Sequence, residues 1–237
     1  MANATQKTAV VTGGSSGIGA ATARALAADG WKVIVAARRL DRLEKLADEI
    51  GGTAIAVDVT DQESVDRLAE TVGEVDLLVN NAGGAKGLDS IHDAKIEDWT
   101  WMYETNVLGT VRVTKALLDG LIARDGHVIN VGSIAGETPY VGGAGYNAAK
   151  FGVAALNRVL RLETHDQTLR VTEIAPGRVA TDFSLVRFGG DAERAESVYQ
   201  DVLNLSAEDI AESIRWVAGL PKHMNIDRIR ITPRDQV

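Results

Sequence analysis

The chain has 237 residues, enough for one large α/β domain or two small ones. Apolar residues make up 45% and charged residues 24% of the sequence, ordinary globular values that argue against disorder, collagen-like repeats and a coiled coil. The 25 basic and 33 acidic side chains give a net charge of -8, which disfavours a nucleic-acid partner or an anionic membrane.

The N-terminal segment has no charged leader followed by an apolar block, and Gly13 and Gly14 interrupt its hydrophobic stretch after a few residues. No apolar run in the chain approaches the ~20 residues that a membrane-spanning helix needs. We therefore expect no signal peptide, no membrane partner and a soluble, cytoplasmic protein.

Short β-branched runs alternate with longer amphipathic segments from the first residues onward, a pattern typical of a parallel sheet flanked by helices. The predicted strands are Lys7–Thr12, Lys32–Ala37, Thr53–Val57, Asp76–Asn80, His127–Gly132, Arg170–Ala175 and Ile226–Ile231. The predicted helices are Gly17–Asp29, Asp41–Ile50, Asp61–Val72, Ile96–Ala123, Tyr146–Asp166 and Ala207–Ala218. This order predicts one doubly wound α/β domain over residues 1–237, with seven parallel strands and helices on both faces.

Residues 181–205 break the pattern, because they carry Gly189-Gly190 and many charges where a plain crossover helix would stand. Loops at the carboxyl ends of parallel strands commonly bind ligands, so we expect this segment to be a substrate lid. The alternative is a solvated excursion of the chain.

The first predicted strand is followed by Thr12-Gly13-Gly14-Ser15-Ser16-Gly17-Ile18-Gly19 and then by an Ala-rich helix. Glycines at this turn let the backbone approach a pyrophosphate, whose charge would lie at the helix N-terminus. A simple tight turn is the alternative. The predicted cofactor-binding residues of this turn are Gly13, Ser15, Ser16, Gly17, Ile18 and Gly19.

Three residues separate the first two glycines of that turn, and this spacing resembles the short-chain dehydrogenase/reductase family. The resemblance continues through Asn80-Asn81-Ala82-Gly83, Asn106, Ser133, Tyr146-Asn147-Ala148-Ala149-Lys150 and Pro176-Gly177-Arg178-Val179-Ala180-Thr181. It covers the chain from Lys7 to Ile231 and implies a Rossmann-type fold. It also implies cofactor contacts from Asp58, Val59, Asn81, Ala82, Gly83, Tyr146, Lys150, Pro176, Gly177, Val179 and Thr181.

The end of the second predicted strand indicates which cofactor binds. Enzymes that prefer NAD usually place an acid there for the ribose 2′-hydroxyl. This strand ends in Ala37-Arg38-Arg39, and two guanidinium groups match a 2′-phosphate instead. We therefore predict NADP(H), with Arg38 and Arg39 as its ligands. The alternative is that both arginines are solvated at the start of the next helix.

Tyr146 and Lys150 are four residues apart, so on a helix they share one face. A neighbouring ammonium and an oxidised nicotinamide would lower the phenol's pKa and make Tyr146 a proton shuttle. Ser133, at the end of a strand, can hydrogen-bond the substrate oxygen and polarise it. By resemblance, Asn106 would hold a water that links Lys150 to solvent.

Within the family, the chain resembles the NADP-dependent 3-hydroxy acid dehydrogenases, which include enzymes oxidising serine and allo-threonine. The likeness rests on residues 97–99, 138–140, 183–188 and 220–226, so Tyr140 is a candidate substrate contact. We expect Arg187, helped by Arg178, to bind a substrate carboxylate. Alternatively, Arg187 is solvated or pairs with Asp191 or Glu193.

The helix that begins at Tyr146 is apolar on nearly every side, and the preceding long helix has a similarly broad apolar surface, so we expect a homo-oligomer. The resemblance favours a tetramer, and a dimer is the alternative. No metal is expected, because cysteine is absent and the four histidines are scattered. We thus predict an oxidoreductase that acts on a small molecule. A non-catalytic NADP-sensing regulator is the rival, and chain length and glycine spacing argue against a nucleotide-sugar epimerase.

Overall fold

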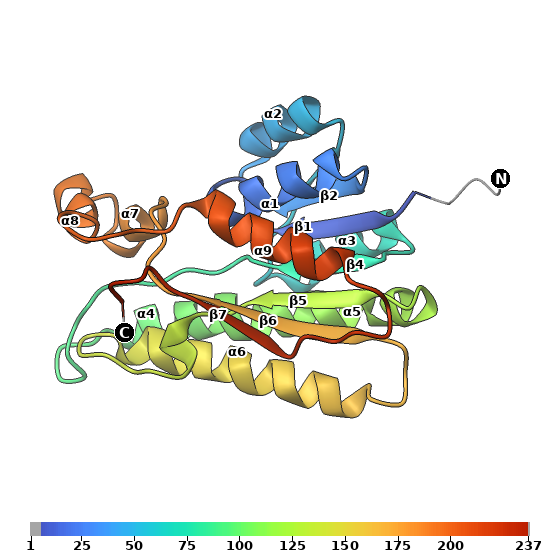
Figure 1. The fold of residues 1–237 in the computed structure, drawn as a ribbon. Helices are drawn as coiled ribbons and strands as arrows, with labels where there is room; N and C mark the ends of the chain where they lie inside the picture. Colours follow the sequence, from blue (N-terminus) through green and yellow to red (C-terminus); the bar gives the residue numbers. More distant parts are fainter. Residues whose placement is uncertain (1–5, 237) are drawn as a thin grey trace.

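Seven parallel strands form one sheet in the order β3-β2-β1-β4-β5-β6-β7 (Figure 1). The computed structural model describes residues 6–236. The strands are β1 Thr8–Thr12, β2 Lys32–Ala37, β3 Thr53–Ala56, β4 Leu77–Asn80, β5 His127–Val131, β6 Arg170–Pro176 and β7 Arg228–Ile231. This confirms the predicted fold class. Strand order reverses between β1 and β4, and α/β sheets bind ligands outside the carboxyl ends of the strands at such a switch point.

Helices cover both faces of the sheet, each over its own apolar core. One face carries α1 Gly17–Ala28, α2 Leu40–Ile50 and α9 Ala207–Gly219. The other carries α3 Gln62–Val72, α5 Gly109–Ala123 and α6 Ala144–Glu163. A third apolar cluster joins α4 Ile96–Tyr103 to the start of α6, around Met102 and Tyr146. This cluster supports the carboxyl edge of the sheet.

The helix predicted over residues 96–123 is interrupted by a five-residue π-helical turn, Glu104–Leu108, between α4 and α5. Side chains bond the carbonyls around this turn: Asn106 Nδ2 donates to Met102 O at 2.7 Å and Thr110 Oγ1 donates to Asn106 O at 2.8 Å. Hydrophobic spacing does not reveal such an insertion, because the apolar faces on either side continue. Turns of this kind frequently occur at functional sites.

The lid predicted at 181–205 contains two short helices, α7 Phe183–Arg187 and α8 Ala192–Ser197, which extend past the end of the sheet (Figure 1). A parallel bridge between Val179 and Leu205 joins the two ends of the segment. The lid is therefore a folded excursion fastened at its base.

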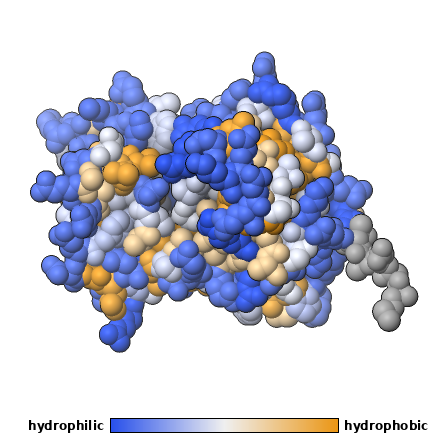
Figure 2. Space-filling model, turned by 90° about the horizontal axis from the view of Figure 1, so that it is seen from above, coloured by the Kyte–Doolittle hydropathy of each residue, from blue (hydrophilic) through white to orange (hydrophobic). Residues whose placement is uncertain are grey.

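Hydrophobic side chains form separate patches among hydrophilic ones on the face shown in Figure 2. Within residues 6–236, no helix is long and apolar enough to cross a membrane. The expectation that no signal peptide is present depends partly on residues 1–5, which lie outside the described residues.

Candidate active site

The glycine-rich turn packs directly against the end of β4. Gly13 has a φ of +65°, and a Cβ there would come within 2.7 Å of Asn81 Nδ2. A Cβ at Gly19 would lie 2.5 Å from the same nitrogen. The Asn81 amide thus occupies the space that side chains at these two positions would need, which explains why both are glycine.

Thr12, the last residue of β1, fixes the position of that asparagine. Its Oγ1 accepts hydrogen bonds at 3.0 Å from the backbone N–H groups of Asn81 and Ala82 and donates to Val79 O at 3.3 Å. Asn81 Nδ2 in turn donates to Thr12 O at 3.0 Å. Local sequence patterns do not reveal this role of Thr12, because its partners lie about seventy residues away in the chain.

The N-terminus of α1 has the features of an anion site. Its N-cap, Ser16, makes no side-chain hydrogen bond to the helix, so the first N–H groups remain available to a ligand. Arg39 Nη2 donates at 2.8 Å to the hydroxyls of both Ser15 and Ser16. Because each hydroxyl accepts from Arg39, its own proton is free to be donated to a phosphate.

Further charges lie around the ends of β2 and β3. The charge of Arg38 reaches Asp58, and Arg42 lies 3.7 Å from Asp182 in the lid. Burial raises the pKa of Asp58, but hydrogen bonds from Thr60 and the charge of Arg38 together hold it below its usual value. An uncapped helix N-terminus beside several guanidinium groups fits a dinucleotide that carries an additional phosphate.

The remaining predicted cofactor residues lie along the same edge. Thr181 faces Gly17, where a Cβ would be 3.4 Å from the threonine side chain. Val179 pairs with Leu205 at the base of the lid, and Gly177 N donates to Ile231 O at 2.7 Å. The segment from Pro176 to Thr181 therefore connects the sheet, the glycine-rich turn and the lid. Ile18 and Val59 pack mainly into the core.

Three of the four predicted catalytic residues meet at the end of β5. Ser133 follows that strand and accepts a hydrogen bond from Ala135 N at 3.1 Å. Lys150 Nζ donates to Val131 O at 2.9 Å and lies 5.8 Å from the centre of the Tyr146 ring. The spacing of four on α6 does place Tyr146 and Lys150 on one face.

Asn106, from the π-helical turn, completes the group. Its Nδ2 donates to Gly84 O at 2.9 Å and its Oδ1 accepts from Gly84 N at 3.2 Å. A Cβ at Gly83 would lie 2.5 Å from Asn106 Oδ1 and 3.9 Å from Lys150 Nζ. Asn106 and Lys150 thus approach each other beside Gly83, as a relay between them requires.

Burial dominates the ionisation of the two central groups. It raises the pKa of the Tyr146 phenol above its usual value, while the Ser133 hydroxyl and the charge of Arg187 act in the opposite direction. We expected Lys150 to lower this pKa, but desolvation of the phenolate outweighs the charges around it. Burial also lowers the pKa of Lys150, to about 8.

The lid contributes two side chains next to Tyr146. The Phe183 ring meets the tyrosine edge-on at 5.5 Å between centres, and Arg187 Cζ lies 5.8 Å from the tyrosine ring centre. Arg187 donates to Gly87 O at 2.8 Å and to Tyr140 Oη at 3.0 Å, so it pairs with neither Asp191 nor Glu193. A small pocket beside them is also lined by Lys86, Asp89, Lys95, Asp98 and Trp99.

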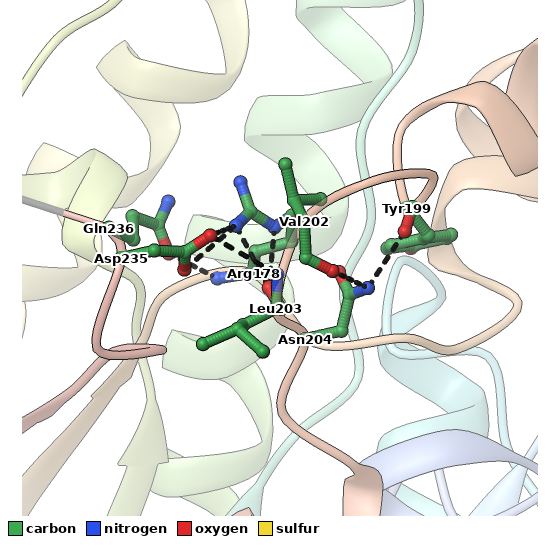
Figure 3. A network of polar contacts seen from close by, with 7 residues as sticks. All are labelled: Arg178, Tyr199, Val202, Leu203, Asn204, Asp235 and Gln236. Carbon is green, nitrogen blue, oxygen red and sulfur yellow. Dashed lines mark hydrogen bonds and ion pairs between the residues drawn. The ribbon is translucent and has the colours of Figure 1, made fainter.

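Arg178 is engaged at the base of the lid (Figure 3). Its guanidinium donates to Leu203 O at 2.8 Å and to both Asp235 oxygens at 3.2 Å, and its backbone N donates to Gln236 Oε1 at 2.7 Å. Asp235 also accepts from Leu203 N at 3.1 Å. These contacts fasten the lid to the C-terminal segment and give no support to the predicted substrate role of Arg178.

Among residues 6–236, no three acidic or histidine side chains lie together as a metal site would require.

The sequence matches a family model described as "short chain dehydrogenase" over residues 7–187. It is 57% identical to an uncharacterized oxidoreductase of Mycobacterium tuberculosis, covering 98% of this chain and 92% of that protein.

A second similar protein is an NADP-dependent 3-hydroxy acid dehydrogenase of Salmonella typhi, which is 41% identical over 96% of this chain and 95% of its own. Among solved structures, the closed form of serine dehydrogenase in complex with NADP+ superposes with a TM-score of 0.94. It is 40% identical, and the superposition covers 97% of this chain and 96% of that one.

Proposed function

The chain belongs to the short-chain dehydrogenase family and is an oxidoreductase acting on CH–OH groups. We propose that it uses NADP(H) to interconvert a 3-hydroxy acid, or a β-hydroxy amino acid, and the corresponding carbonyl compound. The observation that carries the proposal is the convergence of Ser133, Tyr146 and Lys150 beneath a lid arginine.

The choice of NADP(H) is supported by the basic groups at the end of β2. Arg39 is already oriented onto Ser15 and Ser16, and Arg38 lies next to it at a position where a carboxylate would favour NAD. The two similar proteins named above as NADP-dependent or bound to NADP+ favour the same cofactor.

In the proposed reaction, Tyr146 transfers the proton. During oxidation the Tyr146 phenolate removes the alcohol proton, and during reduction the Tyr146 hydroxyl protonates the carbonyl oxygen. Ser133 donates a hydrogen bond to the substrate oxygen and fixes its distance from Tyr146. When bound, NADP(H) supplies or accepts the hydride. Lys150 contributes positive charge that favours the phenolate, and Asn106 holds the water through which the proton reaches solvent.

Arg187 is proposed to bind the substrate carboxylate. Its guanidinium lies between Tyr140 and Tyr146, and its two observed acceptors are both neutral oxygens, so its positive charge remains uncompensated by those bonds. A carboxylate would accept stronger, charge-assisted hydrogen bonds from the same group. The acidic side chain of Asp89 in the adjoining pocket would suit an amino group on the substrate.

Tyr146→Phe tests the proposal. The variant should lose turnover of both 3-hydroxy acids and β-hydroxy amino acids by at least about a thousandfold, because it removes the proton-transferring oxygen and little else. Its affinity for NADPH, measured by fluorescence titration, should remain within about threefold. Tyr103→Phe, on the exposed part of α4, is the control. Near-normal turnover by Tyr146→Phe would refute the mechanism, and NADPH binding without turnover by the unmodified protein would favour the regulator.

A further inference from the structure

A buried carboxylate, Glu173, lies in the middle of β6, the strand next to the edge of the sheet, and the proposed reaction gives it no role. Glu173 is only 3% exposed, and its neighbours in β6, Thr172 and Ile174, are completely buried. An ionised carboxylate in such surroundings is strongly destabilising unless opposite charges or hydrogen bonds compensate it. Burial raises the pKa of Glu173, while the charges of Arg228 and Lys150 act in the opposite direction and favour its ionised form. The groups that compensate the charge of Glu173 therefore have to be identified.

Glu173 extends beneath the turn that carries the catalytic serine. Its Oε1 lies against the Cα of Gly132, closely enough that any Cβ at Gly132 would collide with it. Gly132 separates Val131, whose carbonyl oxygen accepts the Lys150 hydrogen bond, from Ser133. Oε1 makes no hydrogen bond with any of the described residues. One side of the carboxylate thus faces the Lys150 end of the site.

On its other side, Glu173 meets the edge strand. Arg228 of β7 is its register partner, and Arg228 Nε lies 3.4 Å from the second carboxylate oxygen. The same guanidinium lies 2.6 Å from Glu137, which also pairs with Arg230 at 3.4 Å. Glu173 is therefore placed between a cation of the active site and a cation of the sheet edge.

Two acidic side chains on elements packed against α6 are paired with other cations. In the π-helical turn, Glu104 pairs with Arg112 at 3.0 Å, and on α4 Asp98 pairs with Lys86 at 3.5 Å. Arg187 of the lid bonds neutral oxygens near Tyr146. Among the described residues, Glu173 is the charged group whose field raises the Lys150 pKa against the effect of burial.

We propose that Glu173 is a positioning residue that keeps the Lys150 ammonium protonated and directed at the turn between Val131 and Ser133. Arg228 limits this effect by competing for the same carboxylate. The inference rests on the proposed role of Lys150 for its consequence in catalysis, but the charge state itself can be measured separately. Without Glu173, Lys150 would be a buried cation facing no counter-charge from β6, and it would lose its proton at a lower pH.

The test is a direct titration of Lys150 in the full chain labelled with 13C at the lysine Cε, with Lys150→Met used only to assign its NMR signal. In the unmodified protein, the Lys150 pKa should be about 8. Glu173→Gln should lower it by about one pH unit, while Glu173→Asp should keep it within about half a unit. Glu212→Gln is the matched control, because it removes an equal charge from α9 on the opposite face of the sheet and should leave the Lys150 pKa unchanged.

Arg228→Gln provides a test of opposite sign: loss of the competing cation should raise the Lys150 pKa. An unmoved titration in Glu173→Gln, equal shifts in the Gln and Asp variants, or no upward shift in Arg228→Gln would each overturn the proposal. The Arg228→Gln titration tests the proposal even if Glu173→Gln does not fold. The alkaline limb of the pH–rate profile should follow the NMR shift. Failure of the proposed function would instead appear as normal turnover by Tyr146→Phe, whatever the Lys150 titration.

Discussion

Arg38 and Arg39 stand side by side at the end of β2 but differ in what they contact. Arg39 is held by the hydroxyls of Ser15 and Ser16, so it orders the glycine-rich turn as well as adding charge to it. Arg38 acts on Asp58 through its charge. Arg38 can therefore be changed without removing hydrogen bonds from the turn, which makes it the better position for testing cofactor preference.

We expect Arg38→Asp to raise the KM for NADPH about tenfold or more and to change the KM for NADH much less, because a carboxylate repels a 2′-phosphate but accepts a 2′-hydroxyl. Steady-state kinetics with each cofactor measure this. Arg215→Asp is the control, since it reverses the charge of an exposed arginine that pairs with Asp29 at the C-terminal end of α1, away from the glycine-rich turn. Equal changes in both KM values for Arg38→Asp would contradict the 2′-phosphate interpretation.

The role of a single residue could be predicted from the sequence where that role depends on local spacing. Tyr146 and Lys150 could be placed together because four residues make one helical turn. The contacts of Thr12 and Glu173 could not be found in this way, since they depend on strands that are far apart in the sequence. The available signal for Glu173 was a charged residue inside a run predicted to be buried on both faces.

Two elements carry residues into the site in ways that periodicity did not reveal. The π-helical turn directs Asn106 toward Gly84 although the surrounding segment has the pattern of one long helix. The lid was expected from its glycines and charges, but its two helices and its fastening through Arg178 and Asp235 depend on the C-terminal segment. Sequence patterns thus located both elements and missed the contacts that shape them.

The position of α7 has a testable consequence, because it puts Arg187 over Tyr146. Arg187→Met keeps an unbranched apolar stem like that of arginine while removing the charged guanidinium. It should reduce kcat/KM for a 3-hydroxy acid by about tenfold to a hundredfold, since a charge-assisted bond to the carboxylate is lost. A neutral ketone should be reduced at nearly the unmodified rate.

The neutral substrate is the internal control for the lid itself. Arg187 also bonds Gly87 and Tyr140, so its loss could loosen α7. A loosened lid would slow both substrates, whereas loss of a carboxylate ligand affects only the charged one. Equal decreases would therefore rule out Arg187 as the carboxylate ligand.

For the whole molecule, the alternation of strands and helices was sufficient to predict the sheet, and all seven strands end within two residues of their expected positions. The reason is physical: strands covered on both faces are mostly apolar, and their boundaries coincide with glycines and charges. Association between chains is harder to predict, because a broad apolar helix can be covered either by its own sheet or by another subunit.

The structure leaves part of α6 uncovered. Phe151, Val159 and Leu162 are 45%, 46% and 55% exposed, and their spacing places them on one side of the helix. Contact with a second copy would remove this apolar surface from water, so we expect a homo-oligomer.

Phe151→Glu combined with Leu162→Glu should shift the protein to a smaller species in light scattering, because burying two carboxylates in an apolar contact is costly. Leu40→Glu on α2 is the matched control: it places a carboxylate at another exposed leucine, on the opposite face of the sheet, and should leave the mass unchanged. An unmodified protein that is monomeric at every concentration would show that the exposed side of α6 faces only solvent. An unchanged oligomer in the double variant would mean that the contact forms elsewhere on the surface.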